Sequence, residues 1–325
     1  MTITLDLRQA IPGYTLEKRI GAGGYGEVWR AEAPGGLLKA VKIVFGYVDG
    51  DQALREMKAL QRVRHVRHPF LLSLERIDVV DCRLVIVTEL ADGSLKDRFD
   101  AARADRLPGI PRAELLGYLR DAADAFDYMS DQHNLQHLDV KPENLLLVGG
   151  RVKVADFGLV KDLQDPRVSM PAGLTPMYAP PEIFHGAPST HSDQYSLAIV
   201  YQEMLTGQLP FPGKTAAQLA AQHLTATPRL HGLTPVEQQV ILRALAKDPK
   251  DRFASCRELV DSLAACGAAA PPPHAAAPGA EKEDTSAAAG RKNQRSVPIT
   301  PQFAATAPLE DEPEEVENGP RGKKA

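Results

Sequence analysis

Cysteine is scarce in this chain of 325 residues, which contains three: Cys82, Cys256 and Cys266. The number is odd, and the spacing matches neither a disulfide framework nor a set of metal ligands. We therefore expect reduced thiols and a cytoplasmic chain. Neither a disulfide-stapled secreted domain nor a structural metal site is predicted.

Long apolar runs and an excess of positive charge are also missing. Residues 195–205 are apolar but too short to cross a membrane, and Gln202 and Glu203 interrupt them. Residues 1–11 lack the apolar core of a signal peptide. The formal net charge is −4, so neither nucleic acid nor a membrane surface is an expected partner. An apolar content of 43% is ordinary for a folded, soluble chain.

The most informative stretch places an acid, a cation and an amide at short, fixed offsets: Asp139, Lys141 and Asn144. Asp139 can accept a proton from a hydroxyl group, and Lys141 can neutralise a phosphate. Catalysis of phosphoryl transfer consists mostly of positioning and charge stabilisation, which these groups supply.

A predicted hairpin follows this stretch. Residues 145–148 and 152–155 have strand patterns, and the Gly149-Gly150 pair between them favours a turn. The hairpin returns Asp156 to the neighbourhood of Asn144. A carboxylate and an amide oxygen would then lie together, as a hard cation such as Mg²⁺ requires.

A glycine-rich stretch near the N-terminus, Gly21-Ala22-Gly23-Gly24-Tyr25-Gly26, suggests a phosphate-binding loop. Dinucleotide-binding folds use similarly spaced glycines, but their turn opens a helix, whereas residues 28–31 have the pattern of a second strand. Glycines between two strands let backbone amides approach phosphates. An ordinary glycine hairpin is the alternative that this stretch alone leaves open.

Taken together, these motifs resemble the Ser/Thr protein kinase family in its bacterial, eukaryotic-like form. Residues 137–144, His-Leu-Asp-Val-Lys-Pro-Glu-Asn, are similar to the catalytic loop H-R-D-x-x-x-x-N, and Asp156-Phe157-Gly158 is similar to D-F-G. Leu138 departs from the pattern, because the family usually has Arg at this position.

The resemblance implies an α+β, bilobal protein-kinase-like fold. We expect a kinase domain at residues 14–266, with a small β-rich N-lobe (14–90) and a larger helical C-lobe (91–266). Residues 1–13 would form an N-terminal extension. Residues 267–325 are rich in Ala and Pro and then charged, so they cannot bury enough apolar surface to offset their ordering entropy, and we expect a disordered tail.

The resemblance also implies a role for each candidate site residue. Asp139 is the base that orients the substrate hydroxyl, Lys141 lies at the γ-phosphate, and Asn144 and Asp156 bind Mg²⁺. The residues implied at the nucleotide are Gly21, Gly23, Gly26, Val28, Ala40, Lys42, Glu56, Glu89, Ala91 and Asp156.

Within that set, Lys42 stands in the family's A-x-K pattern and is expected to touch the α- and β-phosphates. Glu56 lies in the helical pattern of residues 52–64 and is expected to pair with Lys42; a plain surface glutamate is the alternative. Thr88 corresponds to the gatekeeper, and the backbone of Glu89 and Ala91 to the groups that hold the adenine edge.

Supporting roles fall on residues of the expected C-lobe. Asp193 is expected to hydrogen-bond the backbone of the catalytic loop, and Arg252 to pair with Glu182. Ala179-Pro180-Pro181-Glu182 is similar to the family's M-A-P-E, with Pro180 in place of Ala, which puts the local backbone geometry in question.

The function implied is transfer of the γ-phosphate of Mg-ATP to Ser or Thr hydroxyls of protein substrates in signalling. Lys141, two residues after Asp139, favours Ser/Thr over Tyr specificity. Thr175 supports the same specificity, because residues 173–178 are similar to the G-T-P-x-Y run of Ser/Thr kinases. One alternative is a non-catalytic pseudokinase scaffold, which would normally have lost Lys42, Asp139 or Asp156. The other is a small-molecule phosphotransferase on the same fold.

The tail carries hydroxyl groups at Ser296 and Thr300, downstream of basic residues and upstream of an acidic run. A tethered tail has a high effective concentration at its own active site, which makes these residues candidate autophosphorylation sites. Phosphate there would create a docking point for a phosphothreonine-reading partner. An unmodified, solvated linker is the alternative.

Overall fold

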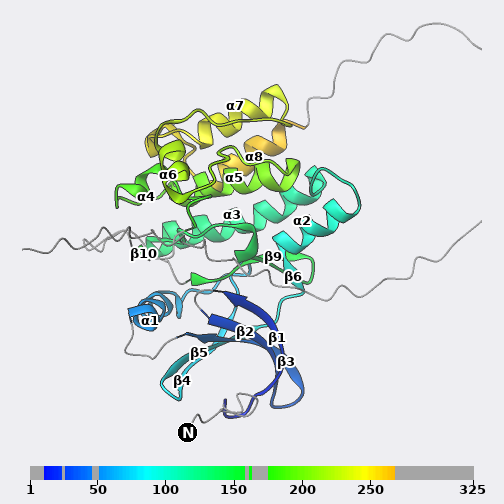
Figure 1. Ribbon diagram of the computed structural model, residues 1–325, viewed down its shortest axis with the longest axis vertical. Helices are drawn as coiled ribbons and strands as arrows, with labels where there is room; N and C mark the ends of the chain where they lie inside the picture. The colour runs from blue at the N-terminus through cyan, green and yellow to red at the C-terminus, as the bar shows by residue number, and fades with distance from the viewer. Residues whose placement is uncertain (1–10, 24–25, 46–50, 158–160, 163–174, 268–325) are drawn as a thin grey trace, which may run out of the picture.

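The computed structural model of the chain describes residues 11–23, 26–45, 51–157, 161–162 and 175–267. They form two lobes, a smaller one built on an antiparallel sheet and a larger one built mainly from helices (Figure 1). The bilobal α+β fold is therefore confirmed. The predicted extension and tail lie almost entirely outside the described residues.

The smaller lobe contains a five-stranded sheet with the strand order β1-β2-β3-β5-β4, in which every neighbouring pair is antiparallel. One face buries Val41 and Val87 against Leu16, and the opposite face buries Ile86 in the main core with Leu60 of helix α1. This two-sided burial explains the nearly continuous apolar runs of the central strands. The elements of this lobe are β1 (Thr15–Gly23), β2 (Gly26–Ala33), β3 (Leu37–Val44), α1 (Asp51–Val63), β4 (Leu74–Val80) and β5 (Arg83–Glu89).

One strand begins later than its sequence pattern predicts. The sequence pattern of residues 71–80 predicts a single strand, but β4 begins at Leu74. Leu71 instead forms an isolated bridge with Val154 of the other lobe, and the Leu72 N–H donates to the Val154 carbonyl at 2.9 Å. The run therefore serves two sheets, and periodicity alone does not show where the partner changes.

Helix α5 (Ser192–Thr206) lies at the centre of the larger lobe and is buried on nearly every side. Helix α3 (Arg112–His133) packs against it. The helical apolar pattern of residues 112–132 predicts a buried stripe from Leu115 to Phe126, and this stripe is buried. The remaining elements are β6 (Gly93–Ser94), α2 (Leu95–Ala104), β7 (Leu135–Gln136), β8 (Leu145–Val148), β9 (Arg151–Val154), β10 (Lys161–Asp162), α4 (Pro181–Phe184), α6 (Ala216–Thr225), α7 (Pro235–Ala244), α8 (Cys256–Ala265) and the 3₁₀ turns Pro142–Asn144 and Pro249–Asp251.

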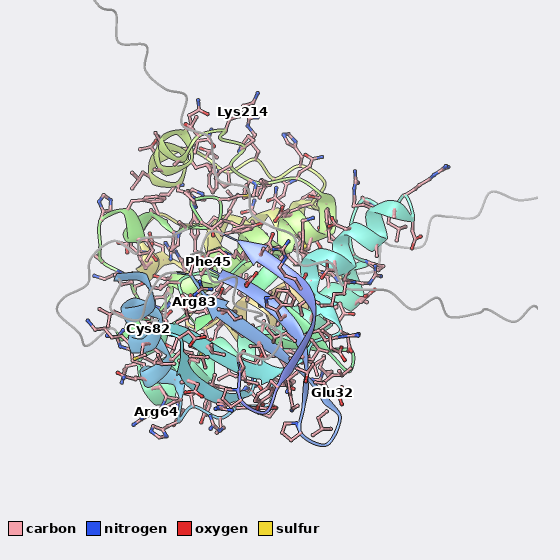
Figure 2. All side chains as sticks on the ribbon, turned by 60° about the horizontal axis from the view of Figure 1, so that its bottom comes forward. Glu32, Phe45, Arg64, Cys82, Arg83 and Lys214 are labelled. Atoms are coloured by element: carbon pink, nitrogen blue, oxygen red, sulfur yellow. The ribbon has the colours of Figure 1, made fainter. Side chains whose placement is uncertain are left out.

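The three thiols are free, as predicted. Cys82 is exposed at the turn between β4 and β5 (Figure 2), Cys256 is buried and Cys266 is half-buried. Among the described residues, no helix combines the length and the apolarity needed to span a membrane.

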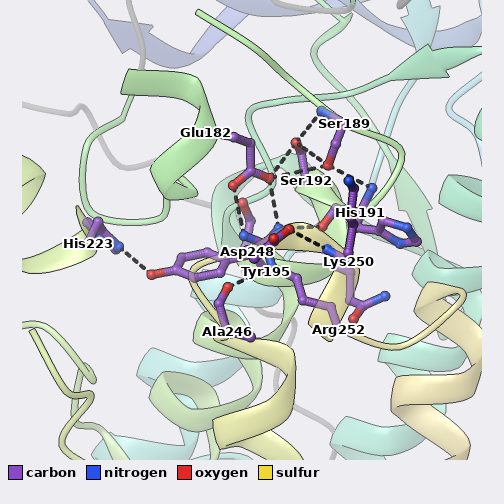
Figure 3. Close-up of polar contacts among 12 residues, drawn as sticks. Glu182, Ser189, His191, Ser192, Tyr195, His223, Ala246, Asp248, Lys250 and Arg252 are labelled. Carbon is purple, nitrogen blue, oxygen red and sulfur yellow. Dashed lines mark hydrogen bonds and ion pairs between the residues drawn. The ribbon is translucent and has the colours of Figure 1, made fainter. Parts of the chain in front are cut away.

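A buried ion pair joins the start of α4 to the segment between α7 and α8. The guanidinium of Arg252 donates to both carboxylate oxygens of Glu182, at 2.7 and 2.8 Å, and their side chains are 0% and 7% exposed (Figure 3). Ser192 donates to the same carboxylate at 2.8 Å. The predicted pairing is confirmed, and Pro180, directly before α4 in the extended conformation, leaves it intact.

Replacing Arg252 with Met should lower the free energy of unfolding by about 3–5 kcal/mol, because the Glu182 carboxylate would stay buried without its partner. Arg120→Met is the matched control, since its pair with Asp261 is 3.2 Å long with side chains 55% and 54% exposed. The control should lose less than about 1 kcal/mol. Urea unfolding followed by circular dichroism measures both, and losses of equal size would contradict the prediction.

Candidate active site

The start of the expected catalytic loop (residues 137–144) is held by Asp193 in the first turn of α5. Its carboxylate accepts the N–H groups of His137 at 2.7 Å and of Leu138 at 2.8 Å. Leu138 adopts a left-handed conformation with φ 63°, which is unusual for a leucine. The expected contact between Asp193 and this backbone is confirmed, and it fixes the point from which Asp139 projects.

The side chain of Leu138 is buried, with 3% of its surface exposed. The family's usual arginine at this position is charged and can bind a phosphate group on the surface. Leucine packed in the core has neither the charge nor the reach.

Asp139, Lys141, Asn144 and Thr175 form one connected polar cluster. Lys141 Nζ lies 2.9 Å from Asp139 Oδ2 and donates to the Thr175 hydroxyl at 3.1 Å. The same hydroxyl donates to Asp139 Oδ1 at 3.0 Å. An aliphatic hydroxyl group is thus held between a carboxylate and an ammonium group.

Lys141 remains charged in this cluster. Burial alone would lower the pKa of its ammonium group, but Asp139 outweighs burial through its charge and its hydrogen bond, and Asp156 adds to the effect. The net result is a raised pKa. A positive charge is therefore retained at the point where sequence analysis expects the γ-phosphate.

Asp156 follows the β8–β9 hairpin, as predicted, and lies beside the expected catalytic loop. The Ala155 N–H donates to the Asn144 carbonyl at 2.9 Å, and Lys42 Nζ donates to Asp156 Oδ1 at 3.0 Å. Burial alone would raise the pKa of Asp156, but the charge of Lys42 and its hydrogen bond lower it to about 2. The group is a carboxylate at neutral pH.

Asn144 and Asp156 fit a hard cation such as Mg²⁺. The amide nitrogen of Asn144 donates to the Asp139 carbonyl at 2.8 Å and to Asp139 Oδ2 at 2.9 Å, so the amide oxygen points away from Asp139. Mg²⁺ usually takes one or two protein oxygens and completes its shell with water and substrate phosphates. One amide oxygen and one carboxylate suit that pattern.

The sheet brings the expected nucleotide-binding side chains to one face. Val28 lies opposite Lys42 across β2 and β3, and Ala40 lies opposite Thr88 across β3 and β5. Because side chains alternate along a strand, all four project from the same side of the sheet. This side faces the larger lobe and Asp156.

The predicted strand–turn–strand arrangement of the glycine-rich stretch is confirmed by the pairing of β1 with β2, whereas residues 24–25 lie outside the described part. Gly21 and Gly23 are in β1. Gly26 opens β2, and a Cβ atom there would lie 2.5 Å from the Ile43 carbonyl oxygen. Close packing against β3 therefore requires a glycine at this position, whatever the backbone binds.

Glu89 and Ala91 lie between the lobes, as expected. The Glu89 side chain also makes contacts that the sequence did not suggest. Its carboxylate accepts from Lys153 Nζ at 2.6 and 2.8 Å and from the Ser73 N–H at 2.8 Å. The Thr88 hydroxyl donates to the Glu89 carbonyl at 3.1 Å. Glu89 thus joins β9 of the larger lobe to the start of β4.

Two expectations fall outside the described structure. The side chain of Glu56, on α1, is not described, so its pairing with Lys42 stays a prediction. The family resemblance also implies an activation segment between Asp156-Phe157-Gly158 and Ala179-Pro180-Pro181-Glu182, with Ser169 and Thr175 as its hydroxyl residues; Ser169 lies outside the described residues.

His137 has a structural role that its position in the sequence motif did not reveal. The ring is fully buried, makes a 2.9 Å hydrogen bond to the Ala155 carbonyl, and meets Phe126 and Phe157 edge-on at 5.8 and 5.7 Å. It joins the expected catalytic loop to the residues on either side of Asp156. Its partners come from separate segments, so only the fold identifies this contact.

The two-lobed fold and the arrangement of Asp139, Lys141, Asn144 and Asp156 are those of a protein kinase domain. Residues 14–263 match the protein kinase domain family, and the chain belongs to this family.

Similar proteins carry serine/threonine-protein kinase names. PknF of Mycobacterium tuberculosis is 32% identical over 269 residues, which cover 77% of this chain and 56% of PknF. PrkC of Bacillus subtilis is 30% identical over 260 residues, 76% of this chain and 39% of PrkC. The probable kinase PknB of Lactococcus lactis is 28% identical over 264 residues, 77% of this chain and 41% of PknB. The chain thus spans about half, or less, of the length of these relatives.

A carboxyl group with a raised pKa contacts the segment that follows Thr175. Glu203, on α5, accepts a hydrogen bond from the Tyr178 hydroxyl at 2.7 Å. Burial raises the pKa of Glu203 from 4.5 to about 7; the Tyr178 hydrogen bond opposes this shift, and the charge of Glu143 adds to it.

The folded state therefore binds a proton that the unfolded chain releases at lower pH. The stabilising contribution of protonated Glu203 is complete below pH 4.5 and is lost as the pH rises to about 7. Glutamine does not titrate, so Glu203→Gln should lack this pH-dependent loss. Between pH 5 and pH 8 the free energy of unfolding should decrease in the wild type by about 2 kcal/mol more than in the variant. Glu32→Gln, at an exposed position (Figure 2), is the control. Urea titrations at both pH values measure the difference, and parallel curves for all three proteins would contradict the assignment.

Proposed function

We propose that this chain is a protein serine/threonine kinase that transfers the γ-phosphate of ATP to Ser or Thr hydroxyl groups of protein substrates. The observation that carries the proposal is the Thr175 hydroxyl, 3.0 Å from Asp139 Oδ1 and 3.1 Å from Lys141 Nζ. A substrate hydroxyl placed at this pair would meet a proton acceptor and a cation together. The serine/threonine-protein kinase names of the relatives support the same reading.

Each side chain then has a definite task. Asp139 orients the attacking hydroxyl and accepts its proton, while Asn144 holds the Asp139 carboxylate through its amide nitrogen. Lys141 neutralises charge on the transferred group, and Lys42 binds the phosphates of the nucleotide. A Mg²⁺ ion held by Asp156 and the Asn144 oxygen would neutralise charge on the phosphate oxygens.

The sheet lobe supplies the nucleotide pocket in this proposal. Val28 and Ala40 provide an apolar surface for the base, and the backbone at Glu89 and Ala91 provides hydrogen bonds to its edge. Gly21 and Gly23 bring the backbone of β1 close to the phosphates.

Two alternatives remain in view. A pseudokinase scaffold needs no intact chemistry, whereas Lys42, Asp139 and Asp156 are all present and in contact with other members of the site. A small-molecule phosphotransferase needs no surface for a protein substrate. The ordered segment after Thr175, from Pro176 to Tyr178, favours a protein acceptor.

Incubation of the purified chain with labelled ATP, Mg²⁺ and generic protein substrates tests the proposal. Lys42→Met and Asp139→Asn should each lower transfer roughly a hundred- to a thousandfold, because each removes charge at the reacting groups. Lys39→Met is the matched control, since Lys39 lies on the opposite face of β3 and pairs with Glu75. Turnover of Lys42→Met within a few-fold of wild type would overturn the phosphate-binding role. No transfer by the wild-type chain to any protein would favour the scaffold.

Phosphorylation of the activation segment should matter little for activity, because buried Leu138 offers no cation to a phosphate group there. Wild type treated with phosphatase and Ser169→Ala should both keep at least about half of the untreated activity. A loss of more than about tenfold in either would mean that another cation binds such a phosphate. Initial rates with a protein substrate at saturating ATP measure the effect.

The cytoplasmic location and the phosphothreonine-reading partner of the tail stay predictions. The hydroxyl groups proposed for that partner, Ser296 and Thr300, lie outside the described residues.

A further inference from the structure

His223, on α6, is fully buried and takes no part in the chemistry proposed above. Its ring lies against Phe211 at 4.6 Å and against Phe184 at 6.2 Å between ring centres. Its Nδ1 lies 3.0 Å from the hydroxyl oxygen of Tyr195 on α5 (Figure 3). A polar ring enclosed in this way needs partners for both of its nitrogen atoms.

The backbone of His223 is fixed independently of its ring. Lys247 Nζ donates to the His223 carbonyl at 2.7 Å, near the end of α6, and lies 4.6 Å from the centre of the Phe211 ring. A cation at a helix C-terminus is stabilising. The ring therefore has little freedom to move away from Tyr195.

The contact with Tyr195 decides which nitrogen of the neutral ring carries the proton. Burial raises the pKa of Tyr195, so the phenol keeps its proton. Within the described part of the chain, His223 Nδ1 is the only hydrogen-bond partner of this hydroxyl. The phenol proton is satisfied only if Nδ1 accepts it, which places the imidazole proton on Nε2.

The backbone of Pro176 and Met177, in the segment that follows Thr175, influences the His223 ring as hydrogen-bonding groups do. Burial, and then the charge of Lys247, lower the pKa of His223 to about 4. Hydrogen bonding to the backbone of Met177 and Pro176 partly opposes this shift by raising the pKa. Nε2 itself is buried and, in this conformation, makes no hydrogen bond of good geometry within the described residues. Because Nδ1 is engaged with Tyr195, Nε2 is the nitrogen left to donate to the backbone of Met177 or Pro176.

The segment from Thr175 to Tyr178 is anchored at both of its ends. Thr175 contacts Asp139 and Lys141, and the Tyr178 carbonyl accepts from the Ser196 hydroxyl of α5 at 2.7 Å. Its middle, Pro176 and Met177, is the part beside His223.

We propose that His223 is a positioning residue for protein substrates: its Nε2–H donates to the backbone of Pro176 or Met177 and fixes the surface beside the accepting hydroxyl. This inference rests on the proposed function and deepens it. The helix α6 thereby sets the shape of the substrate surface without touching the reacting groups. Loss of the donor should weaken the binding of a protein substrate and spare the binding of ATP.

Two substitutions separate the two nitrogen atoms. His223→Gln keeps an amide N–H near the position of Nε2, whereas His223→Asn places its amide near Nδ1 and leaves the segment without a donor. The KM for a protein substrate should rise about tenfold in His223→Asn and less than about threefold in His223→Gln. The KM for ATP should stay within about twofold in both.

Equal KM values for the protein substrate in the two variants would overturn the inference. So would a parallel rise in the KM for ATP with a lower melting temperature in both, because that pattern indicates a purely structural residue. If the wild-type chain transfers no phosphate to any protein, the proposed function fails instead, and the kinetic arm no longer bears on His223.

A second measurement needs no catalytic activity. In the ¹⁵N-labelled wild-type chain, long-range ¹H–¹⁵N correlation spectra at pH 7 report the tautomer of each of the nine histidines. Comparison with the spectrum of His223→Gln assigns the His223 signals. We expect the neutral Nε2–H form, and an Nδ1–H form or a charged ring would overturn the inference.

Discussion

The carboxylate of Asp193 is the anchor on which the geometry of the active site depends. It is 2% exposed and takes the N–H groups of two successive loop residues, His137 and Leu138. A left-handed leucine costs about 1–2 kcal/mol, and hydrogen bonds to a charged acceptor are strong enough to offset it. Asp139 comes directly after this turn of the backbone, so its direction depends on Asp193 although the two side chains play different parts.

Helix α5 extends the same principle to the substrate side of the site. Asp193 in its first turn holds the loop that carries Asp139. The Ser196 hydroxyl donates to the Tyr178 carbonyl at 2.7 Å, and Glu203 accepts from the Tyr178 hydroxyl. Polar groups buried in a core must find hydrogen-bond partners. A buried helix that carries polar side chains therefore dictates where the surrounding loops can lie, and apolar packing alone would not.

The sequence predicted the parts of the site that depend on short-range order. The offsets from Asp139 to Asn144 and the Gly149-Gly150 turn are local, and both glycines have the positive φ that such a turn requires. The bilobal fold and the Glu182–Arg252 pair followed from the family resemblance.

The sequence could not show contacts that depend on which segments meet. Leu71 pairs with Val154 across the lobes although its run continues into β4, and the Glu89 carboxylate binds Lys153 of a distant hairpin. Gly26 is required by its distance to a carbonyl in β3, which no spacing of glycines reveals. In each case the deciding atom lies many residues away, and the local pattern fits more than one partner.

The charges of the site link phosphate binding to cation binding through Lys42. Among the described side chains of the site, Asp139 pairs with Lys141 at 2.9 Å and Asp156 with Lys42 at 3.0 Å. A nucleotide phosphate that recruits Lys42 would take that cation from Asp156, whose low pKa keeps it ionised. The Asp156 carboxylate is then repelled by the phosphates unless another cation, such as Mg²⁺, replaces the Lys42 ammonium group. Without phosphate, a cation at Asp156 must compete with Lys42. With nucleotide and Mg²⁺ bound as proposed, each ligand would remove an obstacle to the other, and joint binding would be favoured over binding of either alone.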